Sequence, residues 1–207
     1  MFDLFISTAL SASLILTSVS IGDVSVARQT ASLIRGEYPV LSSEKLDLSK
    51  RYPVASVSEG FKENILIALG YLSFQDDVLE LKNGEVFAFH KKGILPEFNE
   101  SKIVSQESDF TTNTGYKVVA GLGGNGVCHL ASLINKAASK AGLEVTAPVN
   151  HNFAVIEGIE REYGTSISTR NSPERQNLYV RNNFDYPVRF EFVLNDDILV
   201  LSIIASK

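Results

Sequence analysis

A cluster of glycines that runs directly into an amphipathic helical pattern is the feature that most restricts how this chain can fold. Four glycines fall between residues 121 and 126. After them, apolar residues recur at intervals of three and four, at Val127, Leu130, Ala131, Ile134, Ala137, Ala138 and Ala141. This spacing predicts a helix that packs one face on a core, and Gly142 is placed to end it. Cys128 therefore lies in the first turn of this helix.

A second helix and several short strands follow from similar patterns. Ser58 can cap a helix whose apolar positions recur at the same spacing. Those positions are Phe61, Ile65, Ala68, Leu69 and Leu72. The expected strands cover residues 78–82, 85–90, 116–120, 153–157, 177–181, 188–194 and 198–204. Asn83-Gly84 and Asn195-Asp196-Asp197 are expected turns, and residues 94–114 an expected surface loop. We expect an α+β fold with a mainly antiparallel sheet and two principal helices, with the cysteine at the N-terminus of the second helix.

The N-terminal part of the chain differs from the rest. Residues 1–27 contain no Lys or Arg, and an apolar stretch from Leu4 to Ile21 precedes a small-x-small pattern at Ser25-Val26-Ala27. We expect residues 1–27 to be a signal peptide or a membrane anchor, with a buried N-terminal helix as the alternative. Residues 28–54 are expected to be a linker and residues 55–207 the folded domain. The protein would then be extracytoplasmic, secreted or membrane-anchored at the cell envelope.

Composition narrows the classes of function. The chain is 44% hydrophobic and 21% charged, as expected of a mostly folded protein. It has 19 basic and 24 acidic residues and no Lys/Arg cluster, so nucleic acid is not expected as a partner, and a membrane only through the N-terminal segment. One cysteine rules out an internal disulfide and a Cys-rich zinc site. The histidines and carboxylates lack close metal spacing, and the glycines lack a phosphate-loop ending, so we expect no metal and no cofactor.

Cys128 is the candidate nucleophile. A helix N-terminus stabilises a thiolate through its unpaired N–H groups and partial positive charge. The glycines before it let backbone approach a substrate closely and leave N–H groups free to bind an oxyanion. The alternative is an inert thiol, because free cysteines are often buried and behave as small hydrophobic residues.

Three histidines are candidate bases for this thiol: His90, His129 and His151. Neighbouring helical residues point about 100° apart, so His129 is poorly placed to reach the Cys128 sulfur. His151 lies just before the expected strand 153–157. A helix-borne Cys followed by a His at the start of a strand resembles the layout of papain-like and transglutaminase-like enzymes. We therefore expect Cys128 and His151 to form the catalytic pair.

Four segments resemble sequence boxes of the VanW family, which is named after a protein of glycopeptide-resistance clusters. Asn83 to Phe89 is similar to the Pro-Gly-Glu-Val-Phe-Ser-Phe signature of that family. Gly123 to Cys128 resembles its Gly-Gly-Gly-Ile/Val-Cys box, and Ala141 to Glu144 its Ala-Gly-Leu-Glu box. Arg181 to Val188 looks like its Asn-Asn-x-Asp-Tyr-Pro segment. By this resemblance, residues 55–207 are a VanW-like domain.

The resemblance implies an envelope protein that acts on peptidoglycan stem peptides. Some members of the family have been linked to L,D-transpeptidation through the box cysteine. By this likeness, Cys128 would attack a stem-peptide carbonyl and form a thioester, and His151 would act as base and acid. An amine from a second stem would accept the acyl group. The candidate residues for oxyanion and substrate binding are Gly124, Asn125, Gly126, Val127, His129, Ser132 and Thr165.

Two other functions fit the same residues. A transglutaminase-like cysteine peptidase or amidase would use Cys128 and His151 with water as the acceptor. A non-catalytic domain that binds peptidoglycan or another envelope component would use Cys128 only for packing. Acceptor preference separates the first of these from a transpeptidase, and the reactivity of the thiol separates the second.

Overall fold

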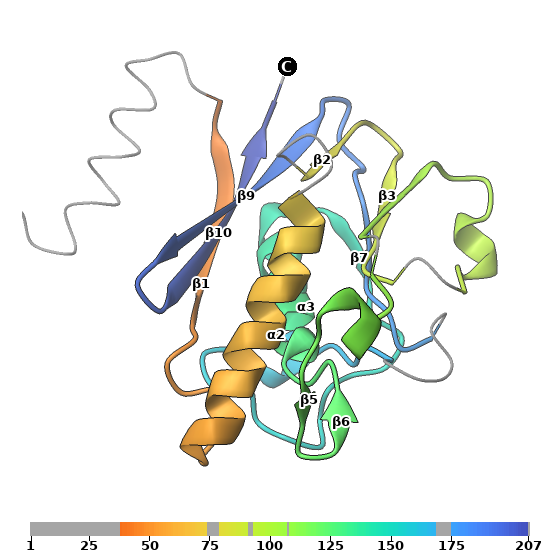
Figure 1. Ribbon diagram of the computed structural model, residues 1–207. Helices are drawn as coiled ribbons and strands as arrows, with labels where there is room; N and C mark the ends of the chain where they lie inside the picture. Colours follow the sequence, from red (N-terminus) through yellow and green to blue (C-terminus); the bar gives the residue numbers. More distant parts are fainter. Residues whose placement is uncertain (1–37, 74–78, 91–92, 107, 169–174, 207) are drawn as a thin grey trace, which may run out of the picture. The chain divides into compact units, whose positions relative to one another are not determined.

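The longest strands form one antiparallel sheet, sheet A (Figure 1). The computed structural model describes residues 38–73, 79–90, 93–106, 108–168 and 175–206. Sheet A contains β1 (Val40–Asp47), β10 (Ile198–Ala205), β9 (Val188–Asn195) and β2 (Leu79–Leu81), in that order. All of its pairings are antiparallel. Along β10 buried and partly buried residues alternate, as expected of a strand with one face on the core.

A second four-stranded sheet, sheet B, is built from shorter strands. It contains β4 (Ile103–Ser105), β3 (Val86–Ala88), β8 (Tyr179–Arg181) and β7 (Glu144–Thr146), in that order. β3 pairs with β4 in parallel, and the other two pairings are antiparallel. All three residues of β3 are buried, because this strand is central in the sheet and covered on both faces.

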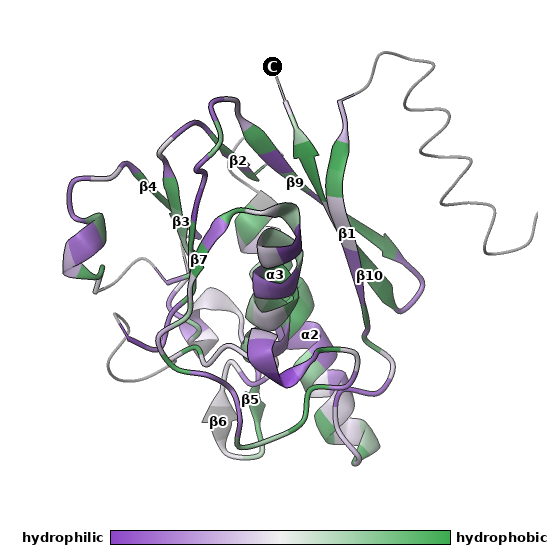
Figure 2. Ribbon diagram, turned by 180° about the vertical axis from the view of Figure 1, so that it is seen from behind, coloured by the Kyte–Doolittle hydropathy of each residue, from purple (hydrophilic) through white to green (hydrophobic). Residues whose placement is uncertain are grey.

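Two long helices lie next to each other beside these sheets (Figures 1 and 2). They are α2 (Ala55–Ser73) and α3 (Val127–Ala141). α3 contacts α2, the sheet A strands β1 and β10, and the sheet B strand β7. Most residues of α3 are buried as a result, polar ones included. A helix enclosed in this way obtains its stability from packing, at about 1.5–3 kcal/mol for each large apolar side chain removed from water.

A two-stranded ribbon leads into α3. It consists of β5 (Val118–Val119) and β6 (Leu122–Gly123). Short 3-10 helices lie at Pro96–Phe98, Thr112–Thr114 and Arg161–Tyr163. The ribbon carries the glycine-rich segment to the start of α3, so it positions the region where Cys128 lies.

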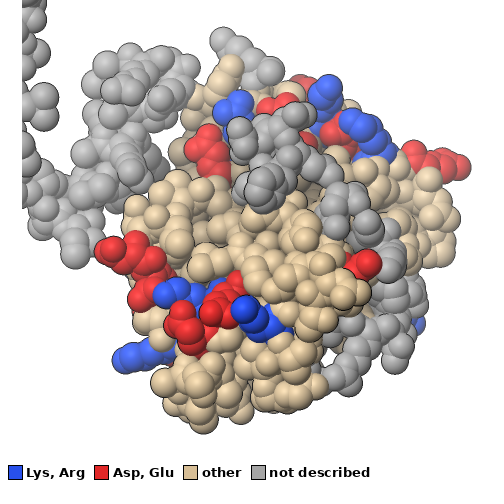
Figure 3. All heavy atoms as spheres, viewed as in Figure 1, with Lys and Arg blue, Asp and Glu red and all other residues tan. Residues whose placement is uncertain are grey.

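Charges of both signs are mixed on the face of the molecule seen in Figure 3. Acidic and basic side chains lie beside one another there in small groups, with uncharged surface between the groups. Several of the ion pairs of the described residues join different elements, such as Lys140 of α3 with Glu44 of β1 at 2.8 Å. Exposed pairs of this kind contribute about 0–1 kcal/mol each, so the fold depends mainly on its apolar core.

The α+β prediction is confirmed: the structure has two long helices and two mainly antiparallel sheets, with Cys128 near the start of the second helix. Gly142 ends α3 in the left-handed region at φ 85°, and its N–H donates to carbonyls of the last turn. The predicted turn at residues 195–197 joins β9 and β10 as a hairpin.

The predicted linker is wrong over residues 40–47. These residues form β1, which pairs with β10 from Val40 opposite Ile204 to Asp47 opposite Ile198. The described domain therefore begins at Tyr38 and not near residue 55. The signal peptide or anchor expected at residues 1–27 lies outside the described residues. Within the described part, no helix has the length and apolar character needed to span a bilayer.

Two local predictions around the first helix and the Asn-Gly turn also need correction. α2 begins at Ala55, so Ser58 lies inside its first turn, where its Oγ accepts the Arg51 N–H at 2.7 Å. Gly84 has a turn conformation with φ 74°, but the strands on either side of it do not pair with each other. β2 belongs to sheet A and β3 to sheet B, so this turn carries the chain from one sheet to the other.

The strand predicted over residues 153–157 is wrong, and, besides β1, the short strands β4, β6 and β7 were missed. Phe153 and Val155 alternate with other residues as in a strand, but they are 76% and 75% exposed and pair with no strand. The predicted loop over residues 94–114 contains β4, and β7 follows α3 directly. β4 and β7 have three residues each and β6 has two, which is too short for alternation to be recognised.

Candidate functional site

The start of α3 is held in close contact with α2. Gly126 precedes the helix with φ 107°, a conformation that residues with a side chain rarely adopt. A Cβ at Gly126 would lie 2.5 Å from the Phe61 carbonyl oxygen of α2. Glycine is therefore required here, because it allows the loop to approach the α2 backbone and to turn into the helix.

Two asparagines hold the glycine-rich loop in place. Asn64 of α2 donates to the carbonyls of Lys117 (3.1 Å) and Asn125 (2.9 Å), and its Oδ1 accepts the Lys117 N–H at 2.7 Å. Asn125 donates its own side-chain amide to the Val119 carbonyl at 2.8 Å. The Asn125 side chain, a predicted substrate-binding group, is thus bound to the ribbon and keeps the loop folded.

The Cys128 sulfur contacts one residue of a neighbouring segment. The Ile167 N–H donates to Sγ at 3.4 Å, and the Ile167 carbonyl lies 3.9 Å from Sγ as the acceptor for the thiol. Cys128 as a whole is partly exposed. Burial of the thiol raises its pKa, and the N–H groups of Ile167 and of Cys128 itself oppose this effect without reversing it. The resting side chain is therefore a thiol at neutral pH.

Ser132 and Thr165 join α3 to the segment that carries Ile167. Ser132 Oγ donates to the Cys128 carbonyl at 2.7 Å and accepts the Thr165 N–H at 2.8 Å. Thr165 Oγ1 accepts from Asn135 at 3.0 Å. Both residues are fully buried, and their hydroxyls form hydrogen bonds within the protein. We assign them to positioning of the Ile167 backbone against Cys128.

His129 is buried in a set of aromatic rings. It is 6% exposed, and its ring centroid lies 5.5 Å from that of Phe61 and 6.1 Å from that of His151. Burial, and then the positive charge of Arg51, lower the pKa of His129 to about 3. Its Nδ1 has no hydrogen-bond partner among the described residues. His129 is therefore neutral near pH 7, with one ring nitrogen unused.

His151 lies beside His129 but makes no hydrogen bond to Cys128 in this structure. It is 7% exposed, and its Nδ1 is 3.3 Å from the Ala154 carbonyl. Burial is the main cause of its lowered pKa. The chain before it runs next to the segment that contacts Cys128, since the Ser166 N–H donates to the Val149 carbonyl at 2.9 Å. Cys128 and His151 thus belong to one region without a hydrogen bond between them, and their catalytic pairing stays a prediction.

The loop that carries His151 is tied down by two buried cations. Lys136 of α3 binds Glu160 at 2.8 Å and the Gly158 carbonyl at 3.1 Å. Arg51 donates to the Glu157 carbonyl at 3.2 Å. These contacts hold the irregular segment after His151 against α3 and the residues before α2.

Arg51 was missed by the sequence reasoning. It is 6% exposed, burial lowers its pKa, and its Nε makes no hydrogen bond to a described residue. Arg51 Nε and His129 Nδ1 are thus two buried polar atoms of this region without a hydrogen bond to a described residue. Such atoms often mark a place where a ligand or a water molecule binds. No sequence motif identifies it, because Arg51 stands alone in the segment expected to be a linker.

An aromatic series runs across the site from one exposed ring to another. Tyr52 packs on Phe61 at 5.6 Å between centroids, and Phe153 packs on His151 at 4.0 Å. Tyr52 is 46% exposed and Phe153 is 76% exposed, whereas the two histidines between them are buried. Exposed aromatic rings beside buried polar groups are typical of ligand and protein interaction surfaces.

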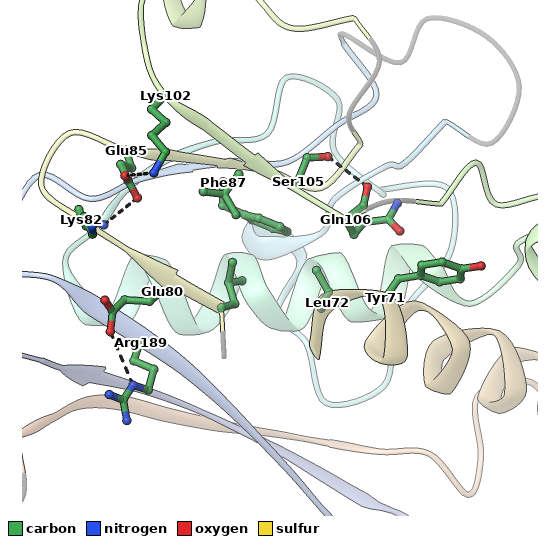
Figure 4. A pocket seen from close by; sticks show the side chains of 12 residues that line it. Tyr71, Leu72, Glu80, Lys82, Glu85, Phe87, Lys102, Ser105, Gln106 and Arg189 are labelled. Atoms are coloured by element: carbon green, nitrogen blue, oxygen red, sulfur yellow. Dashed lines mark hydrogen bonds and ion pairs between the residues drawn. The ribbon is translucent and has the colours of Figure 1, made fainter. Parts of the chain in front are cut away.

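Cys128 lines neither of two cavities found among the described residues. A cavity of about 20 Å³ next to His151 is large enough only for a water molecule. A cavity of about 440 Å³ lies elsewhere, between β2 and sheet B, and neither Cys128 nor His151 lines it (Figure 4). Because chemistry at Cys128 needs an acceptor for the thiol proton, the candidate reactive site is the region of Cys128 and His151, and the large cavity is a separate feature. Among the described residues, no group of three or more His, Cys, Asp or Glu side chains could hold a metal ion.

Comparison with known families gives one match. The model of the family described as "VanW like protein" matches residues 62–204. The chain belongs to the VanW family. Searches of curated proteins and of solved structures found no match.

The VanW-like boxes of this domain contact one another. In the box from Arg181 to Val188, Asn182 donates to the carbonyls of Leu81 (2.9 Å) and Tyr186 (2.8 Å). Asn183 of the same box donates to the Gly142 carbonyl at 3.2 Å and accepts the Glu144 N–H at 3.2 Å. These asparagines fasten the end of α3 and the end of β2. At least these two asparagines of the box therefore have a structural role in the fold.

Proposed function

We propose that this VanW-like protein acts on peptidoglycan as a cysteine acyltransferase of the L,D-transpeptidase type. Membership of the family associates it with the cell envelope and with vancomycin resistance. The observation that carries the proposal is the setting of Cys128: a partly exposed residue in the first turn of α3, with an amide N–H directed at its sulfur. An N–H in that place stabilises the thiolate that develops as the sulfur reacts.

The proposed reaction begins from a neutral thiol and a neutral imidazole. Burial raises the pKa of Cys128 and lowers that of His151, so an ion pair does not form in advance. The thiol proton would pass to His151 while Sγ attacks the stem-peptide carbonyl. The Sγ–C bond of the thioester forms, the peptide C–N bond breaks, and the leaving amine takes the proton from His151. An amine of a second stem then attacks the thioester and restores the thiol.

Backbone N–H groups would stabilise the oxyanion of this step. The N–H groups of Val127 and His129 already donate to the carbonyls of Gly124 and Gly126, at 3.2 and 2.9 Å. This leaves the N–H groups of Gly126 and Cys128 as the candidates, and the Cys128 N–H lies beside its own sulfur. A carbonyl attacked by that sulfur would place its oxygen near the same N–H.

The proposed pathway requires His151 to approach Cys128 on substrate binding. Catalytic hydrogen bonds are often long or absent in unliganded enzymes and form in the complex. The exposed Phe153 packs on the His151 ring, so a substrate that covers Phe153 also acts on the position of the imidazole. The two exposed rings of the aromatic series would flank the substrate.

A non-catalytic envelope-binding domain is the second candidate. The raised pKa of Cys128 and its contacts with the Ile167 backbone favour it, because a thiol with these properties also serves as a packing residue. In that case the aromatic series would bind an envelope component, and the cysteine would have no chemical role.

The test is product analysis with the full-length protein and a disaccharide-tetrapeptide from peptidoglycan. Wild type, Cys128→Ser and His129→Gln are compared by mass spectrometry of the soluble products. We expect cross-linked dimers with release of the terminal amino acid from wild type and from His129→Gln, and none from Cys128→Ser. Hydrolysis without dimers would favour the peptidase or amidase, and binding without any product would favour the non-catalytic domain.

A further inference from the structure

A cavity lies between the two sheets and close to the end of α2. Its volume is about 440 Å³, within the usual range for small-ligand sites. Its lining residues are Tyr71, Leu72, Leu79, Glu80, Lys82, Glu85, Phe87, Lys102, Val104, Ser105, Gln106 and Arg189. Figure 4 shows side chains from α2, β2, β3 and β4 around this space. The cavity has no part in the proposed chemistry of Cys128.

The inner part of the cavity is apolar and preformed. Leu72, Leu79 and Phe87 are 4%, 6% and 0% exposed, and they belong to the main hydrophobic core. These side chains come from α2, β2 and β3, so three packed elements fix their positions. A rigid apolar floor of this kind receives the side chain or backbone of a ligand without a large ordering cost.

The carboxylates at the rim are already neutralised by neighbours. Glu85 binds the Lys102 ammonium at 2.7 Å and accepts the Lys82 N–H at 3.1 Å. Glu80 accepts from Ser206 at 3.1 Å and lies 3.8 Å from Arg189. Neither acid is therefore free to serve as the main contact of an incoming cation.

Lys82 differs from the other charged groups of the rim. Its side chain is exposed and forms no ion pair with any described residue. Arg189, on the same rim, already lies 3.8 Å from Glu80 and 3.7 Å from Glu191, so acids of the protein balance its charge. An exposed ammonium without an ion pair favours a ligand that carries a carboxylate or another anionic group.

The strands around the cavity favour a peptide as the carrier of that carboxylate. β2 is an edge strand of sheet A and β4 is an edge strand of sheet B, and both contribute to the lining of the cavity. An outermost strand has backbone groups without a partner in its own sheet, and an extended peptide can hydrogen bond to them. Val104 and Ser105 of β4 lie at this wall.

We propose that this cavity binds the C-terminal part of an extended peptide, with its terminal carboxylate at Lys82 and its backbone along β4. The apolar floor would receive one side chain of the peptide. This site is separate from Cys128 and does not depend on the thiol. A peptidoglycan stem and the C-terminus of a protein share this chemistry, so the experiment must compare the two sources.

The experiment measures binding to the full-length protein by fluorescence anisotropy. The probes are an N-terminally labelled stem tetrapeptide that ends in D-Ala, its C-terminal amide, and an L-tetrapeptide with a free carboxylate. We expect about a 10-fold weaker Kd for the amide, the effect of losing one charge-assisted hydrogen bond. Tighter binding of the stem than of the L-peptide assigns the site to peptidoglycan, and the reverse assigns it to protein C-termini.

Variants of the rim locate the binding. Lys82→Met is expected to weaken binding of the free-carboxylate peptide about 10-fold, and Lys82→Arg is expected to retain it. The matched control is Lys50→Met, because Lys50 is exposed and lies outside the cavity. Cys128→Ser should bind as the wild type does, so loss of turnover and loss of this site are distinguishable. Equal binding of acid and amide, or equal Kd values for Lys82→Met and Lys50→Met, would overturn the proposal.

Discussion

The amide nitrogen of Ile167 lies 3.4 Å from the Cys128 sulfur, and its N–H donates to that sulfur. The carbonyl of the same residue is 3.9 Å from Sγ and accepts from the thiol. The backbone of Ile167 can therefore bind Cys128 in either protonation state. Its N–H favours the thiolate, and its carbonyl favours the thiol. Since burial is the largest influence, the thiol is the resting form.

This geometry predicts how fast Cys128 is alkylated at each pH. Because its pKa is raised, the thiolate fraction should reach one half only above the ordinary cysteine value of about 8.5. Iodoacetamide labelling of the full-length protein between pH 6 and 10, followed by mass spectrometry, gives this midpoint. A midpoint well below that of free cysteine would contradict the neutral resting thiol and indicate a preformed ion pair.

His151→Ala should separate catalysis from thiol ionisation. No hydrogen bond joins His151 to Cys128 at rest, so the alkylation midpoint should not change. Turnover should fall by a factor of about 10² to 10⁴, the usual effect of losing a general base. His129→Gln is the matched control, because a histidine with a pKa of about 3 cannot be half-protonated near pH 7. Equal loss of turnover in both variants would mean that the two histidines only support the fold.

Stability should decrease as the pH falls through the weakly acidic range. His129 has a pKa of about 3 in the folded protein and an ordinary value of 6.5 when unfolded. Between these values the unfolded state binds a proton that the folded state does not. The free energy of unfolding therefore decreases as the pH falls. At pH 4.5 the loss from His129 alone is about 2–3 kcal/mol, and the lowered pKa of His151 acts in the same direction.

Urea denaturation at pH 7 and pH 4.5 measures this effect. The free energy of unfolding of wild type should fall more between the two pH values than that of His129→Gln, which has no imidazole to protonate at this position. Carboxylates contribute equally to both proteins and cancel in the comparison. The same pH dependence in both proteins would show that His129 is not held neutral by burial.

The start of α3 could be predicted because local sequence determines it. Glycines before an apolar pattern of helical period indicate where a helix begins, and the structure places Cys128 in that first turn. Long-range pairing is not visible in the same way. β1 contains Ser42, Ser43, Glu44 and Lys45, and it is a strand because β10 lies beside it.

The region around His151 shows a second limit of sequence reasoning. Phe153 and Val155 alternate as in a strand, yet their side chains point to solvent. Arg51 could not be connected with His129 from the sequence, because the folding of α2 against α3 brings the charge of Arg51 close to the His129 ring. Ser132 and Thr165 were predicted from the sequence as substrate-binding residues, but only the structure shows that both are buried and that the Ser132 hydroxyl accepts the Thr165 N–H.

Gly126→Ala should destabilise the protein more than an alanine at another left-handed glycine. Its Cβ would meet the Phe61 carbonyl oxygen at 2.5 Å, in addition to the strain of φ 107°. Gly121 has φ 77°, and no atom lies within 4 Å of the place that a Cβ would occupy, so Gly121→Ala carries only the conformational cost of about 1 kcal/mol. We expect Gly126→Ala to lose at least about 2 kcal/mol more than Gly121→Ala in urea denaturation. Equal losses would mean that α2 can move away from the loop without cost.

The central claim is that Cys128 forms a thioester with a peptidoglycan stem peptide. Intact-protein mass spectrometry after rapid acid quenching of the full-length protein with a disaccharide-tetrapeptide donor tests it most directly. We expect an adduct equal to the donor minus its terminal amino acid, located on Cys128, absent from Cys128→Ser and removed by hydroxylamine. Cross-linked product formed at the wild-type rate by Cys128→Ser, or no adduct under conditions in which the donor is shown to bind, would contradict it.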